Sequence, residues 1–215
     1  MANVIIREYV SSDRDKIRQI SVSTAMLGRP GRLFFEGDEV LADALTLYYT
    51  DYEPESCFVA EVDGQVVGYI LSTKDTRSMD SVFLSKIFKP LLLKALCQGV
   101  FLHGKNWMLF LRVLGVAMIG GFFMPNFYAE YPAMIHINVM EEHRDLGLGE
   151  RLMKRCLQYL GNGDLSGVRL ATMSDRASEF FQKQGFRLFH TSPRPYFYTV
   201  LRKYVTLRIY CRKFE

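Results

Sequence analysis

The chain has 215 residues, of which 49% are hydrophobic and 23% are charged, and its formal net charge is +4. This length is sufficient for one well-packed domain, and this composition predicts a folded protein and argues against a disordered one. A charge of +4 spread along the chain does not indicate a nucleic-acid-binding protein, although it would suit an anionic ligand.

The chain contains no cysteine motif. Its four cysteines, Cys57, Cys97, Cys156 and Cys211, are widely spaced and form no Cys-x-x-Cys pair. We interpret them as free thiols in a reducing compartment, in preference to disulfides or zinc ligands. The histidines are scattered too, so no metal site is predicted. The N-terminus lacks a basic region followed by a long apolar run, so we expect no secretion signal and a cytoplasmic location.

The first part of the chain predicts a strand followed by two helices. Residues 4–9 favour a strand, and Ser11 to Asp13 supply capping groups for a helix that reaches about Met26. A second helix is expected from Asp38 to Tyr49. The aromatic residues in and beside it can belong either to the core or to the wall of a substrate site: Phe34, Phe35, Tyr48, Tyr49 and Tyr52.

Asp63 and Gly64 give the strongest hairpin signal, between strands predicted at Phe58–Glu61 and Gln65–Ser72. The second of these strands is almost continuously apolar, which is typical of a central strand buried on both faces. Gly68 lies midway along it and marks either a bulge or a close packing contact.

Residues 75–130 are the least regular part of the sequence. Apolar runs at Leu91–Leu96 and Trp107–Ile119 predict two or three helices inserted between the third and fourth strands. The uncharged stretch 113–129 contains Pro125 and two adjacent glycines, and it falls short of a membrane span. Three roles stay open for this insert: an added helical layer or homodimer face, a lid over a hydrophobic acceptor, and peripheral membrane contact.

Residues 133–160 carry the strongest functional signal. Ala133–Met140 alternates in the manner of a strand, and apolar residues from Leu152 to Leu160 recur at helical spacing. Two glycines, Gly147 and Gly149, lie between the strand and the helix. The first N–H groups of a helix lack intrahelical partners, and glycines allow close approach, so such a turn can hold a phosphate. An ordinary turn is the alternative explanation of the glycines alone.

This glycine pattern differs from two common phosphate loops. It lacks the Gly-Lys-Ser/Thr of a Walker loop, and Leu152 stands where a dinucleotide loop has its third glycine. Both absences argue against nucleoside triphosphates and nicotinamide cofactors as ligands.

Downstream, we predict a strand at Val168–Thr172, a helix at Arg176–Gln184 ended by Gly185, a strand at Phe186–His190, an ambiguous segment at Tyr196–Lys203 and a final strand at Val205–Cys211.

With its strand and helix, Arg144-x-x-Gly147-x-Gly149 resembles the acyl-CoA loop of the GNAT N-acetyltransferase family, whose pattern is Gln/Arg-x-x-Gly-x-Gly/Ala. The resemblance continues through Ala177, Phe180-Phe181 and Gly185-Phe186. Tyr131-Pro132-Ala133 and Ile135-His136-Ile137 look especially like the acetyltransferase-like domains that accompany some O-GlcNAc hydrolases. Both ends of the chain are covered by the family-level resemblance, but residues from about 75 to 130 are not.

The resemblance implies a fold and an activity. The fold is α/β, a mixed and mostly antiparallel sheet of about seven strands flanked by helices. One domain would span residues 1–215, with the helical insert at about 75–130. The activity is direct transfer of an acetyl group from acetyl-CoA to a primary amine on a small molecule or peptide. The alternative is a noncatalytic acyl-CoA-binding module, or a membrane- or protein-interaction module. Aminoglycosides, polyamines, amino sugars, protein N-termini and lysines stay open as acceptors.

The resemblance also implies a set of cofactor-binding residues. Main-chain groups of the fourth strand would pair with the pantetheine arm, namely Ile137, Asn138, Val139 and Met140. The pyrophosphate would lie on the loop, namely Arg144, Asp145, Leu146, Gly147, Leu148, Gly149 and Glu150. Four residues would flank the arm from the other side, namely Met173, Ser174, Ala177 and Phe180.

The catalytic acid is where the chain departs from the family pattern. Where the family often has a tyrosine, this chain has Phe181, which has no proton to donate. Tyr196 or Tyr198 could serve instead, or the thiolate leaves unassisted, or the chain is inactive. His136 is the candidate base, because its reference pKa of about 6.5 suits proton removal near neutral pH. A histidine in a strand can equally be a packing residue.

Overall fold

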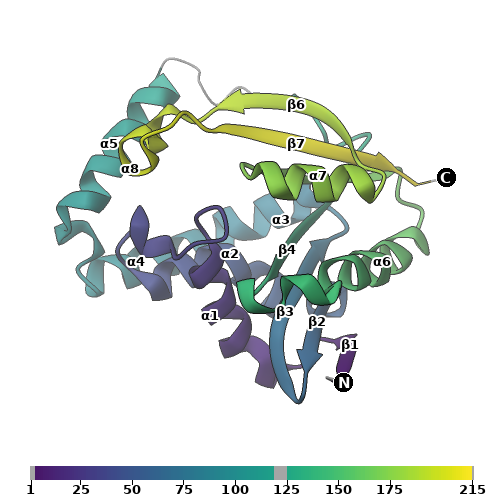
Figure 1. Ribbon diagram of the computed structural model, residues 1–215. Helices are drawn as coiled ribbons and strands as arrows, with labels where there is room; N and C mark the ends of the chain where they lie inside the picture. The colour runs from purple at the N-terminus through teal and green to yellow at the C-terminus, as the bar shows by residue number, and fades with distance from the viewer. Residues whose placement is uncertain (1–2, 119–124, 215) are drawn as a thin grey trace.

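The computed structural model describes residues 3–118 and 125–214, and a seven-stranded sheet runs through them (Figure 1). The strand order is β1-β2-β3-β4-β5-β7-β6, and only the β4–β5 pair is parallel. The strands are β1 (Val4–Glu8), β2 (Cys57–Val62), β3 (Gln65–Thr73), β4 (Ala133–Val139), β5 (Gly167–Thr172), β6 (Arg187–Pro193) and β7 (Thr206–Lys213). The predicted mixed α/β sheet is confirmed.

Helices cover both faces of the sheet. They are α1 (Arg14–Thr24), α2 (Asp38–Tyr52), α3 (Thr76–Val82), α4 (Phe88–Cys97), α5 (Gly104–Met118), α6 (Leu148–Gly161), α7 (Asp175–Lys183) and the short α8 (Tyr198–Leu201). On one face, Leu152 of α6 and Phe181 of α7 pack with Ile135 of β4. On the other, Ile17 of α1 and Tyr49 of α2 pack with the β2–β3 hairpin. Helices α1, α2, α6 and α7 thus bury apolar residues against the sheet, as their helical spacing predicts.

The β2–β3 hairpin brings β3 tightly against β4. The register shifts at Ala60 and Glu61, which pair with Gly68 and Val66, so Val67 is the extra residue of a bulge. A Cβ placed on Gly68 would lie 3.1 Å from the Asn138 carbonyl oxygen. Both readings of Gly68 therefore hold: the bulge is beside it, and the neighbouring strand leaves no room for a side chain.

The insert between β3 and β4 is helical, as predicted. It contains α3, a π-helical segment at Phe83–Ile87, α4, a 3₁₀ turn at Val100–Leu102, and α5. The predicted apolar run past Met118 extends over residues 119–124, which lie outside the described residues. Helix α4 packs on α2, and α5 lies beside the Pro195–Phe197 turn that leads into α8 (Figure 1). The ambiguous segment thus becomes helical where it meets the insert.

Candidate active site

The β4 and β5 strands separate shortly after they meet. They pair only at Ala133 with Val168 and at Met134 with Arg169. Beyond that point β4 keeps its pairing with β3 as far as Val139, and no strand among residues 3–118 and 125–214 pairs with its other edge. Unpaired strand edges present N–H and C=O groups that can bond an amide-bearing ligand.

A cavity of about 610 Å³ occupies this opening and reaches both faces of the sheet. On the α1–α2 face it is lined by His136, Asn138 and Tyr49. On the α6–α7 face it is lined by Ile137 and Phe180, together with the turn before α6. A molecule in this cavity could therefore contact the loop from one side while its other end faces His136.

The turn before α6 presents bare backbone to the cavity. A 3₁₀ segment (Glu141–Leu146) ends at Gly147, which has φ +68° and caps α6 without any side-chain bond. A Cβ placed on Gly147 would meet no heavy atom within 4 Å. The first amides of a helix have no intrahelical acceptor and lie at the positive end of its dipole. The turn is therefore open to an anionic ligand.

Arg144 reaches across the cavity beside this turn. Its Nε donates to the Val139 carbonyl oxygen at 3.2 Å, and its guanidinium lies against Gly28, where an added Cβ would be 2.8 Å from an Arg144 nitrogen. The side chain thus bridges the end of β4 and the turn after α1. This position places a fixed positive charge next to the free helix amides.

Most of the predicted cofactor residues line the cavity. They are Ile137, Asn138, Val139, Arg144, Gly147, Gly149, Glu150, Met173, Ser174, Ala177 and Phe180. Four others, Met140, Asp145, Leu146 and Leu148, are not among its walls. Leu148 is fully buried in the core, and Asp145 is fully exposed, 3.7 Å from Arg176. The Ser174 hydroxyl accepts from the Ala177 amide and so caps α7. Cofactor contacts of all these residues stay predictions.

His136 is held in a short polar chain. The Asn138 Nδ2 atom lies 2.9 Å from His136 Nε2 and donates at 2.9 Å to the Tyr69 hydroxyl. Since an amide nitrogen has only donors, His136 Nε2 is the accepting, unprotonated nitrogen. Burial lowers the pKa of His136 to about 4, partly offset by a hydrogen bond to the Leu45 carbonyl. The imidazole is therefore neutral at physiological pH.

Two tyrosines to which the sequence assigned no catalytic role lie in the site, although Tyr49 was a candidate for the wall of a substrate site. Tyr49 is 6% exposed and lines the cavity on the His136 side, and Tyr69 is fully buried. Burial raises the pKa of each, so both phenols keep their protons. Tyr69 faces Asn138 only through the β3–β4 register. The sequence left Tyr49 open between the core and the wall of a substrate site, and in the structure it lines the cavity.

The two phenols that were predicted as acids lie elsewhere. Tyr196 packs on Phe197, with ring centroids 4.6 Å apart, in a cluster that also includes Met173. Tyr198 is 41% exposed and packs against Tyr204. Neither lines the cavity, whereas Phe181 does. The catalytic roles of Tyr196 and Tyr198 stay predictions.

Residues 98–186 match the model of the Acetyltransferase (GNAT) family. Among solved structures, SsHAT is similar over 99% of this chain and 99% of its own, with TM-score 0.73 and 24% identity. A Drosophila melanogaster polyamine N-acetyltransferase that forms N-acetylagmatine has TM-score 0.64 and 15% identity, over 98% and 100% of the two chains. The yncA structure from Salmonella typhimurium, with its cofactor acetyl-CoA, has TM-score 0.58 and 12% identity, over 99% and 94%. The chain therefore shares its fold with these three proteins.

Proposed function

We propose that this chain, whose family match and fold support an acetyl-CoA-dependent acyltransferase of the GNAT family, acetylates the primary amine of a small acceptor. The supporting observation is the single cavity between β4 and β5, which joins the open turn before α6 to the neutral His136. Bound acetyl-CoA would supply the activated thioester. The chain's own residues would bind, orient and move protons.

On the cofactor side, the amides after Gly147 would bind the pyrophosphate, with Arg144 adding charge. The free edge of β4 would pair with the pantetheine amides, and Ala177 and Phe180 of α7 would cover the arm. In this arrangement the thioester would lie along β4 on the way to His136. The specific likeness to domains that accompany O-GlcNAc hydrolases stays a prediction.

Direct transfer is favoured because no cysteine is placed as a nucleophile. All four thiols are free, and none of them lines the cavity. Burial raises the pKa of Cys156 and that of Cys211 to about 12, so neither is a thiolate at neutral pH. The amine itself would therefore attack the thioester carbon.

His136 would receive the proton that the amine loses. In this structure its Nε2 accepts from Asn138, and an incoming amine N–H can replace that donor at small net cost. A neutral imidazole with a low pKa is a weak base toward a free ammonium ion. It suffices once the nitrogen has bonded to the carbonyl carbon, because the nitrogen then becomes strongly acidic.

Tyr49 is our candidate for the acid that protonates the departing thiolate, since it is the protonated phenol that lines the cavity. Tyr49→Phe should lower kcat by about tenfold with little change in acetyl-CoA affinity. Tyr196→Phe and Tyr198→Phe are the matched controls and should keep kcat within about twofold. Thiol release in steady state measures all three. A larger loss of kcat in either control than in Tyr49→Phe would instead assign the acid to Tyr196 or Tyr198.

The acceptor end of the cavity is neutral, which suggests an acceptor whose amine is its only cation. The charged residues in the walls are Arg144, Glu150 and Arg176, which lie in the turn before α6, in the first turn of α6 and on α7. Asp43 of α2 is already paired with Arg18 and Lys94. The walls around His136 are Leu45, Tyr49 and Met134. A second cation would therefore lose its hydration without gaining a partner.

The proposed function is tested by thiol release from acetyl-CoA with a panel of amines. We expect kcat/KM for phenylethylamine to exceed that for agmatine by at least about tenfold, because agmatine carries a guanidinium. Product mass would locate the acetyl group on nitrogen. Faster turnover of agmatine would contradict the neutral acceptor end. Acetyl-CoA binding without thiol release from any amine would instead favour the noncatalytic module, which the absence of a hydroxyl at Phe181 makes the second candidate.

A further inference from the structure

The insert presents bulky apolar side chains to solvent along α4, α5 and the segments around them. The exposed fractions are 71% for Leu84, 53% for Leu93, 56% for Leu96, 88% for Leu102 and 50% for Trp107. Trp107 also stacks on Phe110, with ring centroids 5.4 Å apart. Isolated exposed apolar residues are ordinary, whereas several large ones gathered in one helical segment favour a surface that binds a partner.

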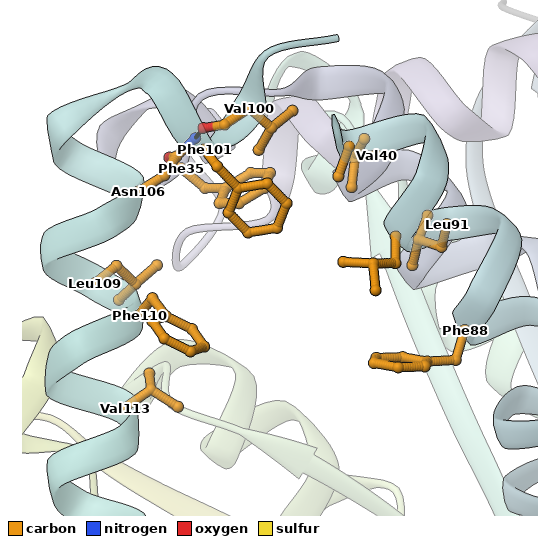
Figure 2. A pocket seen from close by; sticks show the side chains of 12 residues that line it. Phe35, Val40, Phe88, Leu91, Val100, Phe101, Asn106, Leu109, Phe110 and Val113 are labelled. Atoms are coloured by element: carbon orange, nitrogen blue, oxygen red, sulfur yellow. Dashed lines mark hydrogen bonds between the residues drawn. The ribbon is translucent and has the colours of Figure 1, made fainter. Parts of the chain in front are cut away.

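An apolar cavity of about 300 Å³ lies between α4 and α5 (Figure 2). Phe88 and Leu91 enter it from α4, and Leu109 and Phe110 enter it from α5 (Figure 2). Its polar wall residue is Asn106, whose amide already bonds to the backbones of Glu36 and Val100. The cavity therefore offers no free polar group to a polar ligand and is suited to hydrocarbon.

The formally charged residues that the insert itself contributes to this surface have one sign. From residue 81 to residue 129 the sequence has no Asp or Glu, and its formally charged residues are Lys86, Lys89, Lys94, Lys105 and Arg112. Lys94 and Lys105 pair with carboxylates of Asp43 and Glu36, at 2.6 Å in each case. Lys86 and Lys89 are exposed, and neither forms an ion pair within residues 3–118 and 125–214. Lys86 lies over the Tyr52 ring, 5.6 Å from its centroid, and an anionic partner would add a counter-charge to both lysines.

We propose that the insert docks on the surface of an anionic lipid bilayer. Exposed Leu and Trp side chains beside lysines are the composition of helices that lie in the membrane interface. Within the described part of the chain, none of the helices is long and apolar enough to cross a bilayer, so the contact is peripheral. Charge argues against a second copy as the occupant, because two such faces would set lysines against lysines. This proposal stands independently of the acyl transfer.

The test is co-sedimentation of the full chain with vesicles of phosphatidylcholine alone or with about 30% phosphatidylserine. We expect the protein to pellet with the mixed vesicles only, and to be released at about 1 M salt. The double variants Leu93→Glu/Leu96→Glu and Lys86→Glu/Lys89→Glu should each weaken binding by at least about tenfold. Equal pelleting with both kinds of vesicle, or with neither, would overturn the proposal.

Matched controls separate this surface from general charge and hydrophobicity. Lys154→Glu/Lys183→Glu makes the same change of charge at exposed positions on α6 and α7, and Leu188→Glu replaces a leucine that is 50% exposed on β6. Both should keep wild-type vesicle binding, and all variants should keep the wild-type melting temperature. Equal losses in the controls and in the insert variants would overturn the proposal. So would light scattering that shows a wild-type dimer made monomeric by Leu93→Glu/Leu96→Glu, without vesicle binding.

Discussion

Replacing Gly147 by aspartate should raise the Kd for acetyl-CoA by at least about 100-fold, the equivalent of two lost charge-assisted hydrogen bonds. Gly147 sits at φ +68° immediately before α6, and the space where its side chain would lie is open. A carboxylate in that space would repel the pyrophosphate and accept from the helix amides itself. Isothermal titration calorimetry measures the affinity, and thermal melting checks the fold.

Gly64→Asp is the matched control for this prediction. Gly64 has φ +79°, its Cβ position is also open, and it lies in the β2–β3 turn away from the cavity. The same charge and the same backbone strain are thus introduced where no cofactor is expected. Gly64→Asp should lower stability by about 1 kcal/mol, as Gly147→Asp does, and should leave the Kd unchanged. Unchanged affinity in Gly147→Asp would rule out the turn before α6 as the pyrophosphate site.

Replacing His136 by glutamine should lower kcat by about 100-fold while acetyl-CoA affinity stays within about twofold, because a base acts only in the chemical step. Asn138→Ala removes the donor that occupies His136 Nε2 and keeps the imidazole, so its kcat should fall by less than about tenfold. Stopped-flow or steady-state thiol release gives both values. A kcat for His136→Gln equal to that of wild type would make His136 a packing residue.

The low pKa of His136 has two further measurable consequences. Because the imidazole is neutral above a pH of about 4, kcat/KM for the amine should show no inflection near pH 6.5 and should rise with deprotonation of the acceptor. Stability should also depend on this residue, since the unfolded chain binds a proton below about 6.5 that the folded chain binds only below about 4.

The contribution of His136 to the free energy of unfolding is therefore complete above about pH 6.5 and is lost as the pH falls toward 4, because protons then bind the unfolded chain first. The loss should be on the order of 1–2 kcal/mol, reduced from the full linkage value because the side chain faces a cavity that water can enter. His136→Gln should lack this part of the pH dependence in urea unfolding. Parallel curves for the two proteins between pH 6.5 and 4.5 would contradict the buried neutral imidazole.

The sequence alone was enough to identify the turn before α6, because its chemistry is local. Gly147 and Gly149, the alternating strand before them and the helical spacing after them are neighbours in the chain, and free amides at a helix start need no distant contact. The hairpin at Asp63-Gly64 and the cap of α7 by Ser174 were predictable for the same reason. The role of Gly68 could not be decided from the sequence, because the close contact that excludes a side chain there is with β4, far along the chain.

Only the tertiary structure decided what surrounds that turn. The separation of β4 and β5 after Met134 depends on the relative orientation of two strands that α6 connects in the sequence. No local sequence pattern predicts that orientation. Tyr69 reaches Asn138 through strand register, and Tyr49 enters the cavity through the packing of α2 on the sheet. Leu148 shows both contributions: its place in the turn before α6 predicts a main-chain contact to phosphate, whereas only the fold shows that its side chain fills the core. Side-chain direction is set by long-range burial, and burial is a property of the assembled fold.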